Sequence, residues 1–180
     1  MDEKQRTRIS KFLSKVLRHE PEAAGLTLET GGWVPIADLL PGLARAGTRI
    51  SREDLDVVVE KCDKQRFAID DTGTKIRANQ GHSAEVELQF EPVEPPNELF
   101  HGTAETNLSA VLRDGLLKMA RHHVHLSADG ITARKVGGRH GKPVVLTVLA
   151  AQMSTAGHVF YRSANGVWLV DHVPPQYLRL

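Results

Sequence analysis

The chain has 180 residues, enough for one ordinary domain or two small ones and too few for a large multidomain enzyme. Hydrophobic residues make up 41% and charged residues 25%, close to the globular average, which excludes wholesale disorder. The formal net charge of +1 excludes a histone-like polycation and gives no direct sign of a nucleic-acid partner.

Neither a membrane segment nor a cysteine framework is predicted. No apolar run approaches transmembrane length, and the first ten residues are too polar for a signal peptide. Cys62 is the single cysteine, which excludes an intrachain disulfide and a cysteine-based zinc cluster. We therefore expect a soluble, cytoplasmic protein with no membrane partner. A monomer is a separate expectation, and the sequence leaves the oligomeric state open.

The first 80 residues predict three helices followed by a hairpin. Apolar residues at helical spacing predict a first helix that ends near residues 18–21, because Pro21 disfavours a helical residue before it. A turn at Gly31-Gly32 and a short helix around residues 35–40 follow. Ser51 and Asp54 indicate the start of a third helix. Two alternating segments around the turn at residues 71–74 predict a hairpin, and the whole order is typical of a winged helix.

Charge divides the chain into two parts. Residues 1–100 contain 14 basic and 18 acidic residues, whereas residues 101–180 contain nine basic and four acidic residues and seven of the nine histidines. Between them, residues 85–98 contain five glutamates, three prolines and no basic residue. We predict a first domain over residues 1–90, a second over residues 97–180 and a linker over about 84–97. A long surface loop within one domain is the alternative.

The second part predicts a mixed α/β lobe with short strands. Strands are expected at residues 99–101, 124–126 and 144–149, and a helix containing Leu108 is expected to stop at Gly115. Asn165-Gly166 predicts a hairpin between residues 158–161 and 167–170. The strands are too closely spaced for βαβ units, so an antiparallel or split sheet is favoured. Neither a dinucleotide-binding glycine motif nor a phosphate-binding P-loop is present.

Arginine and histidine carry the candidate chemistry, because a planar guanidinium can bind two phosphate oxygens at once. Arg18-His19 ends the first helix, where a basic pair can also act as a simple cap. Lys64, Arg66 and Arg77 surround the predicted wing, as phosphate contacts or as a solvated face. Alternation along residues 121–125 predicts that Arg121, His123 and His125 share one face and His122 the other.

The histidines suggest two kinds of site. His123 and His125 could share a metal with His101 or Asp129, but catalytic zinc needs three ligands and supporting carboxylates. The acid-poor second lobe fits an anion site better, so we predict no metal. His101-Gly102-Thr103, at a strand end, suits nucleotide binding, with glycine admitting the ligand. The glycine-rich residues 137–141 contain Arg139 and form either a phosphate-contacting loop or a helix terminator.

Several short motifs, in this order and over nearly the whole chain, resemble those of the RNA 2′-phosphotransferase family. They are Leu17-Arg18-His19, Gly32-Trp33-Val34-Pro35, Asp63-Lys64-Gln65-Arg66-Phe67, Gln80-Gly81-His82-Ser83, His101-Gly102-Thr103, Arg121-His122-His123-Val124-His125-Leu126-Ser127 and Val167-Trp168-Leu169-Val170 with Val173-Pro174. The resemblance implies an α+β chain: an N-terminal winged-helix lobe that binds RNA, then an ADP-ribosyltransferase-like α/β lobe with a split antiparallel sheet that binds NAD.

The resemblance also implies a two-step reaction with NAD as co-substrate and no metal. An internal RNA 2′-phosphate attacks C1″ of NAD and expels nicotinamide, which leaves RNA-2′-phospho-ADP-ribose. The ribose O2″ then attacks the phosphate, giving 2′-hydroxyl RNA and ADP-ribose 1″,2″-cyclic phosphate. Removal of the 2′-phosphate left by tRNA splicing is the activity that names the family.

The family's residues map onto this sequence position by position. The resemblance implies catalytic roles for Arg18, His19, Arg66 and Arg121, and NAD-binding roles for His101, Gly102, Thr103, His125, Ser127 and Arg139. Two alternatives remain at this point. One is an ADP-ribosyltransferase that modifies nucleic-acid ends or a protein and stops after the first step. The other is a winged-helix regulator that senses a nucleotide.

Overall fold

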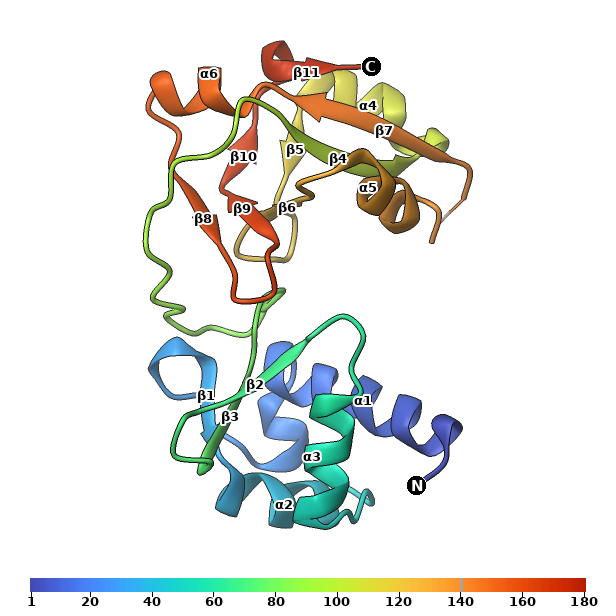
Figure 1. Ribbon diagram of the computed structural model, residues 1–180, viewed down its shortest axis with the longest axis vertical. Coiled ribbons are helices and arrows are strands. Elements are labelled where there is room, and N and C mark those ends of the chain that lie inside the picture. The colour runs from blue at the N-terminus through green and yellow to red at the C-terminus, as the bar shows by residue number, and fades with distance from the viewer. Residues whose placement is uncertain (140) are drawn as a thin grey trace. The chain divides into compact units, whose positions relative to one another are not determined.

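The structure, a computed structural model, describes residues 1–139 and 141–180 (Figure 1). Its helices and strands divide into an N-terminal unit, Met1–Gln89, and a C-terminal unit, Phe90–Leu180. Each unit has a hydrophobic core of its own. No helix within the described ranges is long and apolar enough to cross a membrane.

Three helices and a small sheet form the N-terminal unit. The helices are α1 (Glu3–Arg18), α2 (Ile36–Arg45) and α3 (Arg52–Glu60), and the antiparallel sheet has the order β1 (Trp33–Pro35), β3 (Lys75–Ala78), β2 (Phe67–Ile69). The buried face of α1 packs Leu13, Val16 and Leu17 into the core. The predicted start of α3 is confirmed, since Ser51 and Asp54 form a reciprocal capping box.

The second helix is longer than predicted. It runs through Pro41 to Arg45, whereas the sequence predicted a helix around residues 35–40. Its buried face continues past the proline, with Ile36, Leu39 and Leu43 in the core, and this burial outweighs the missing backbone donor. The structure also adds β1, which the sequence did not predict; there Trp33 pairs in register with Arg77, whose guanidinium lies 4.5 Å from the Trp33 ring centroid.

The described residues of the C-terminal unit form three small antiparallel sheets. One has the order β11 (Leu178–Arg179), β7 (Pro143–Val148), β4 (Leu99–Ala104), and a second has the order β6 (Val124–Leu126), β9 (Trp168–Val170), β8 (Phe160–Arg162). The third pairs β10 (His172–Val173) with β5 (Leu116–Leu117). A bridge between Phe100 and Ser127 joins β4 to the residue that follows β6.

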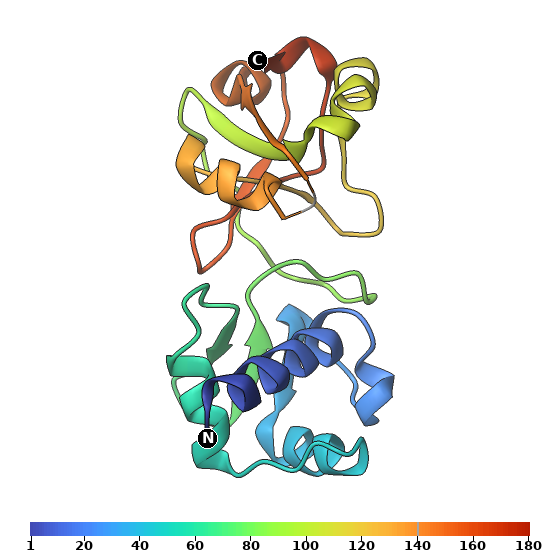
Figure 2. The same cartoon turned by 90° about the vertical axis from the view of Figure 1, so that its right-hand side faces the viewer.

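The α-helices that the structure describes beside these sheets are α4 (Leu108–Asp114), α5 (Gly130–Gly137) and α6 (Ala150–Thr155). Figure 2 shows α5 lying along β4. The predicted stop of α4 at Gly115 and the hairpin across Asn165-Gly166 are both confirmed. The coarser predicted fold, a mixed α/β chain with small antiparallel sheets, is therefore confirmed, while the winged-helix and ADP-ribosyltransferase assignments stay predictions.

The predicted linker over residues 84–97 is hydrogen-bonded on both sides. Within the N-terminal unit, the Gly31 N–H donates to the carbonyl of Glu87 at 2.6 Å. Within the C-terminal unit, the Val93 N–H donates to the carbonyl of Phe160 at 2.9 Å. The first part of the segment is thus hydrogen-bonded to the N-terminal unit, and the later part is hydrogen-bonded to the C-terminal unit.

Candidate functional site

Arg18 and His19 lie at the end of α1 and are held by a segment 64 residues further along the chain. The N–H groups of Ser83 and Ala84 donate to the Arg18 carbonyl at 2.8 and 2.9 Å. The Ser83 Oγ lies 2.7 Å from the His19 Nδ1. The backbone N–H groups of residues 83–84 thus satisfy a carbonyl at the end of α1. Under the interpretation of Arg18-His19 as a simple cap, the basic side chains would have stabilised this helix end.

The turn at Gly31-Gly32 supports the same segment. Gly32 has a φ of +76°, and a Cβ at this position would lie 2.9 Å from the Nε2 of His82, whose side chain is buried. A side chain here would therefore be strained and would displace His82. Two of the sequence motifs, the one containing Gly32 and the one containing His82, meet in this contact.

Arg66 is positioned by the end of α3 and by the residue after β3. Its backbone N–H and its Nη1 lie 3.5 and 3.4 Å from the Sγ of Cys62. Asn79, which is buried, donates its backbone N–H to the Arg66 carbonyl at 2.9 Å and its Nδ2 to the Gln65 carbonyl at 2.6 Å. These contacts hold Gln65 in a left-handed conformation, with φ of 42°, immediately before Arg66.

In the C-terminal unit, three candidate residues form a hydrogen-bonded series. The Nη1 of Arg121 lies 3.1 Å from the Nδ1 of His125, and the Nδ1 of His101 lies 3.1 Å from the carbonyl of His125. A guanidinium can only donate, so His125 accepts at Nδ1 and carries its proton on Nε2. A carbonyl can only accept, so His101 carries a proton on Nδ1. The structure therefore brings together His101, Arg121 and His125.

Burial determines the charge of His101. Desolvation is the largest cause and lowers the pKa of this imidazole below its ordinary 6.5, the bond to the His125 carbonyl opposes the shift, and the charge of Arg121 adds to it. At neutral pH His101 is thus uncharged, with a proton on Nδ1 and an acceptor at Nε2. A neutral acceptor beside an arginine suits hydroxyl and phosphate groups of a nucleotide.

His123 lies in different surroundings from His125. Its ring packs against Tyr161 and Phe90, with centroid distances of 5.4 and 6.0 Å, and burial is the largest cause that lowers its pKa. Residues 121–123 precede β6, so the alternation predicted along residues 121–125 does not hold over its first three residues, although Arg121 and His125 do touch. Across residues 1–139 and 141–180, no three side chains of His, Cys, Asp or Glu are grouped so that they could hold a metal ion.

The remaining predicted NAD-binding residues have different structural settings. A Cβ on Gly102 would lie 1.7 Å from the carbonyl oxygen of Ala133 in α5, so close packing of α5 on β4 requires this glycine. This reason differs from the predicted one, admission of a ligand. Thr103 is buried, and Ser127 exchanges two backbone hydrogen bonds with Phe100. Arg139 is exposed just after α5, and His140 of the same loop lies outside the described residues.

Sequence reasoning assigned no role to three supporting residues: Cys62, Asn79 and Ser83. Cys62 and Asn79 position Arg66, and Ser83 contacts His19. A signal was available for Ser83, because it belongs to the motif at residues 80–83. Cys62 and Asn79 gave no such signal, since their contacts depend on how the end of α3 meets the end of β3.

Comparison with known proteins gives a consistent result. The family model described as "RNA 2'-phosphotransferase, Tpt1 / KptA family" matches residues 4–172. A protein of Nostoc punctiforme is 55% identical over 179 residues, 99% of each chain, and one of Trichormus variabilis is 58% identical over 180 residues, covering 100% of this chain and 99% of the relative. A protein of Streptomyces griseus is 52% identical over 187 residues, with 100% and 99% covered. All three are named "Probable RNA 2'-phosphotransferase".

Proposed function

The chain belongs to the RNA 2′-phosphotransferase, Tpt1/KptA family, and from this premise we propose that it transfers an internal 2′-phosphate of RNA to NAD. The products are RNA with a 2′-hydroxyl, ADP-ribose 1″,2″-cyclic phosphate and nicotinamide. The observation that carries the proposal is the family match over residues 4–172, which includes every candidate residue. We further propose a monomer in the cytoplasm.

The two units receive separate tasks in this proposal. The N-terminal unit, with three helices and a three-stranded sheet, acts as a winged-helix lobe that binds RNA. The C-terminal unit, with its small antiparallel sheets, acts as an ADP-ribosyltransferase-like lobe that binds NAD. Support for the second task comes from the series Arg121, His125 and His101, which offers a cation, an Nε2–H donor and a neutral acceptor to a nucleotide.

In the first step, a 2′-phosphate oxygen forms a bond to C1″ of the nicotinamide ribose. The bond from C1″ to the nicotinamide nitrogen breaks, and its electron pair leaves with nicotinamide. The nucleophile is already an anion, so this step needs orientation of two anionic partners more than a strong base. We assign the 2′-phosphate to Arg18, Arg66 and Arg121. We assign the ADP-ribose part of NAD to the remaining candidate residues, which are His101, Gly102, Thr103, His125 and Ser127, with Arg139 contacting phosphate.

In the second step, ribose O2″ attacks phosphorus and the bond from phosphorus to the RNA O2′ breaks. The O2″ proton is removed, and the leaving RNA oxygen gains a proton. Arg18, Arg66 and Arg121 would stabilise the charge that develops on the phosphate oxygens. His19 would take part in proton transfer, since an imidazole titrates near neutrality. The contact between Ser83 and the His19 ring supports this role, because it would restrict the orientation of the ring.

A direct assay tests the proposal. Purified protein is incubated with NAD and a short RNA that carries one internal 2′-phosphate. We expect stoichiometric release of nicotinamide and conversion to 2′-hydroxyl RNA, followed by mass spectrometry of both products. Absence of turnover with freshly purified, folded protein would refute the proposed activity.

The same assay separates the two alternatives. A transferase that stops after the first step would release nicotinamide and leave ADP-ribose on the RNA or on a protein. A nucleotide-sensing regulator would release no nicotinamide and would bind a specific duplex DNA. Complete transfer to a cyclic phosphate product excludes both.

A further inference from the structure

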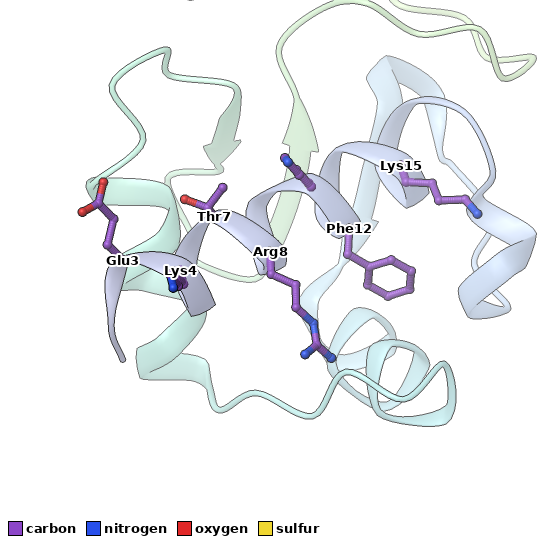
Figure 3. Close-up of a pocket in the computed structure, with 7 residues that line it drawn as sticks. Glu3, Lys4, Thr7, Arg8, Phe12 and Lys15 are labelled. Atoms are coloured by element: carbon purple, nitrogen blue, oxygen red, sulfur yellow. The ribbon is translucent and has the colours of Figure 1, made fainter.

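One face of α1 carries a line of cations on the side away from the core. Lys4, Arg8, Lys11 and Lys15 follow one another at intervals of four, three and four residues, which places them on one helix face. With Glu3, Thr7 and Phe12 they line a shallow hollow of about 760 Å³. Figure 3 shows Lys4, Arg8, Phe12 and Lys15 in succession along the helix, with Arg8 and Phe12 projecting from the same side. We call the four cations Lys4, Arg8, Lys11 and Lys15 the α1 basic face.

Acidic neighbours do little to balance this face. Lys15 pairs with Glu20 at 2.9 Å, while Lys4, Arg8 and Lys11 form no ion pair with any described residue. Like charges three and four residues apart on a helix repel and destabilise it. Several exposed cations elsewhere do have acidic partners: the pairs are Arg52–Asp56, Lys75–Glu29, Arg113–Asp114, Lys118–Asp171 and Lys142–Glu105. The α1 basic face thus concentrates positive charge that an anionic partner would neutralise.

The shape of the face favours one kind of anion. From Lys4 to Lys15 the helix rises about 16 Å, so the cations form a line and not a single-phosphate pocket. The line continues by one further helical turn to Arg18 and His19, the residues assigned to the 2′-phosphate. Phe12 is half-buried and lines the hollow, so an aromatic ring lies among the cations. Cations that follow a backbone, with an aromatic ring for a base, are typical of a surface that binds an RNA strand.

We propose that the α1 basic face binds the RNA backbone beside the 2′-phosphate and guides the strand toward Arg18 and His19. This inference rests on the proposed function, because it takes RNA as the substrate. It adds a contact with the backbone phosphates of several consecutive nucleotides, none of which carries a 2′-phosphate. The contact is electrostatic and independent of base sequence, so it strengthens binding of any flanking RNA.

The test is the salt dependence of RNA binding in the absence of NAD, so that no turnover occurs. The variant Lys4→Gln/Arg8→Gln/Lys11→Gln removes three charges and keeps good helix formers. The matched control, Arg45→Gln/Arg49→Gln/Lys61→Gln, removes three exposed charges from other parts of the same unit. Each protein is titrated with a single-stranded RNA carrying a 2′-phosphate and with the same RNA carrying a 2′-hydroxyl.

Removal of the α1 charges should raise the Kd for both RNAs by about 10- to 100-fold at 0.1 M salt and reduce the salt slope by about 2, while the control changes little. The KM for RNA in the full reaction should rise by about the same factor. Equal slopes in wild type and variant, or an equal loss in the control, would overturn the proposal. The proposal would also be overturned if the triple variant lost binding to phosphatidylglycerol vesicles while its RNA binding stayed unchanged. That result would assign the α1 basic face to lipid binding.

Failure of the proposed function would give a different result. Binding of 2′-hydroxyl RNA requires neither NAD nor phosphate transfer, so its salt slope reports on the α1 basic face alone. A protein that releases no nicotinamide but shows the predicted slope change would retain the RNA surface and lose the proposed activity. If wild-type protein turns over normally and the triple variant shows the same salt slope as wild type, the proposed activity would stand and the RNA-binding role of the α1 basic face would be refuted.

Discussion

The two units position their candidate residues by different means. In the N-terminal unit, Arg18 and Arg66 are held through their backbone carbonyls, by the N–H groups of residues 83–84 and by Asn79. In the C-terminal unit, the side chain of Arg121 contacts the ring of His125, and His101 contacts the His125 carbonyl. The first arrangement fixes the main chain of both arginines and adds side-chain contacts from Cys62 to Arg66 and from Ser83 to His19, whereas the second acts through the side chains of Arg121 and His101.

This difference has consequences for each half of the chemistry. The supports of Arg18 and Arg66 are uncharged, so the positions of these two arginines should respond weakly to pH. His19 should respond clearly to a change at Ser83, and Arg66 to a change at Asn79. The C-terminal series depends on which nitrogen of each imidazole carries a proton, so it should respond to charge and to pH. Four predictions follow this contrast from the largest expected effect to the smallest.

Loss of the arginine in the C-terminal series should have the largest effect. Arg121→Ala removes a cation assigned to the transesterification, and we expect kcat to fall by about 100- to 1000-fold. The second step should suffer more than the first, so ADP-ribosylated RNA should accumulate in single-turnover experiments. The control Arg134→Ala, at an exposed position on α5, should retain activity. Unaltered intermediate levels in Arg121→Ala would contradict the assigned role.

Substitution of Gly102 should destabilise the C-terminal unit. A Cβ there would lie 1.7 Å from the Ala133 carbonyl oxygen, so Gly102→Ala must displace α5 from β4. We expect a loss of about 2–3 kcal/mol in the free energy of unfolding, measured by denaturant titration. Gly130→Ala is the matched control, because a Cβ at that position meets no atom within 4 Å. Equal stability of the two variants would show that close packing does not require Gly102.

Removal of the serine that supports His19 should have a moderate effect. Ser83→Ala deletes the 2.7 Å contact with the His19 Nδ1 but leaves the backbone bonds to Arg18. Loss of one hydrogen bond of about 1 kcal/mol predicts a fall of about fivefold in kcat. Because the side chain of Ser83 acts only through His19, Ser83→Ala should cause no further loss in a His19→Ala background. The conservative Ser83→Thr should recover part of the activity, and Ser109→Ala on the surface of α4 should be silent.

The smallest effect concerns the pH dependence of stability. Burial lowers the pKa of His101 in the folded state below its ordinary 6.5, so on acidification the unfolded chain gains its proton first. This group therefore leaves stability unchanged above pH 6.5 and reduces it as pH falls from 6.5 through the folded pKa. The stability difference between wild type and His101→Gln should shift against wild type over that interval. A difference independent of pH, measured by urea titration, would contradict a neutral, partly buried imidazole at His101.

Local features of the fold could be predicted because neighbouring residues determine them. The amphipathic pattern of α1, the capping box of α3 and the hairpin at Asn165-Gly166 each depend on a few residues close in sequence. The extension of α2 past Pro41 could not be read in this way. It is decided by burial of Leu43 in the core, which opposes the local preference of proline.

The candidate site shows the same division. The sequence alone determined which residues are present, in which order, and with which family they agree, since these depend on side-chain identity along the chain. Only the tertiary structure decided that Ser83 contacts His19 and that Asn79 positions Arg66. Only the tertiary structure showed that α5 packs so closely on β4 that residue 102 must be glycine. It also decided the protonated nitrogens of His101 and His125. Contacts between residues distant in sequence, and the desolvation that shifts a pKa, arise only when those residues pack together.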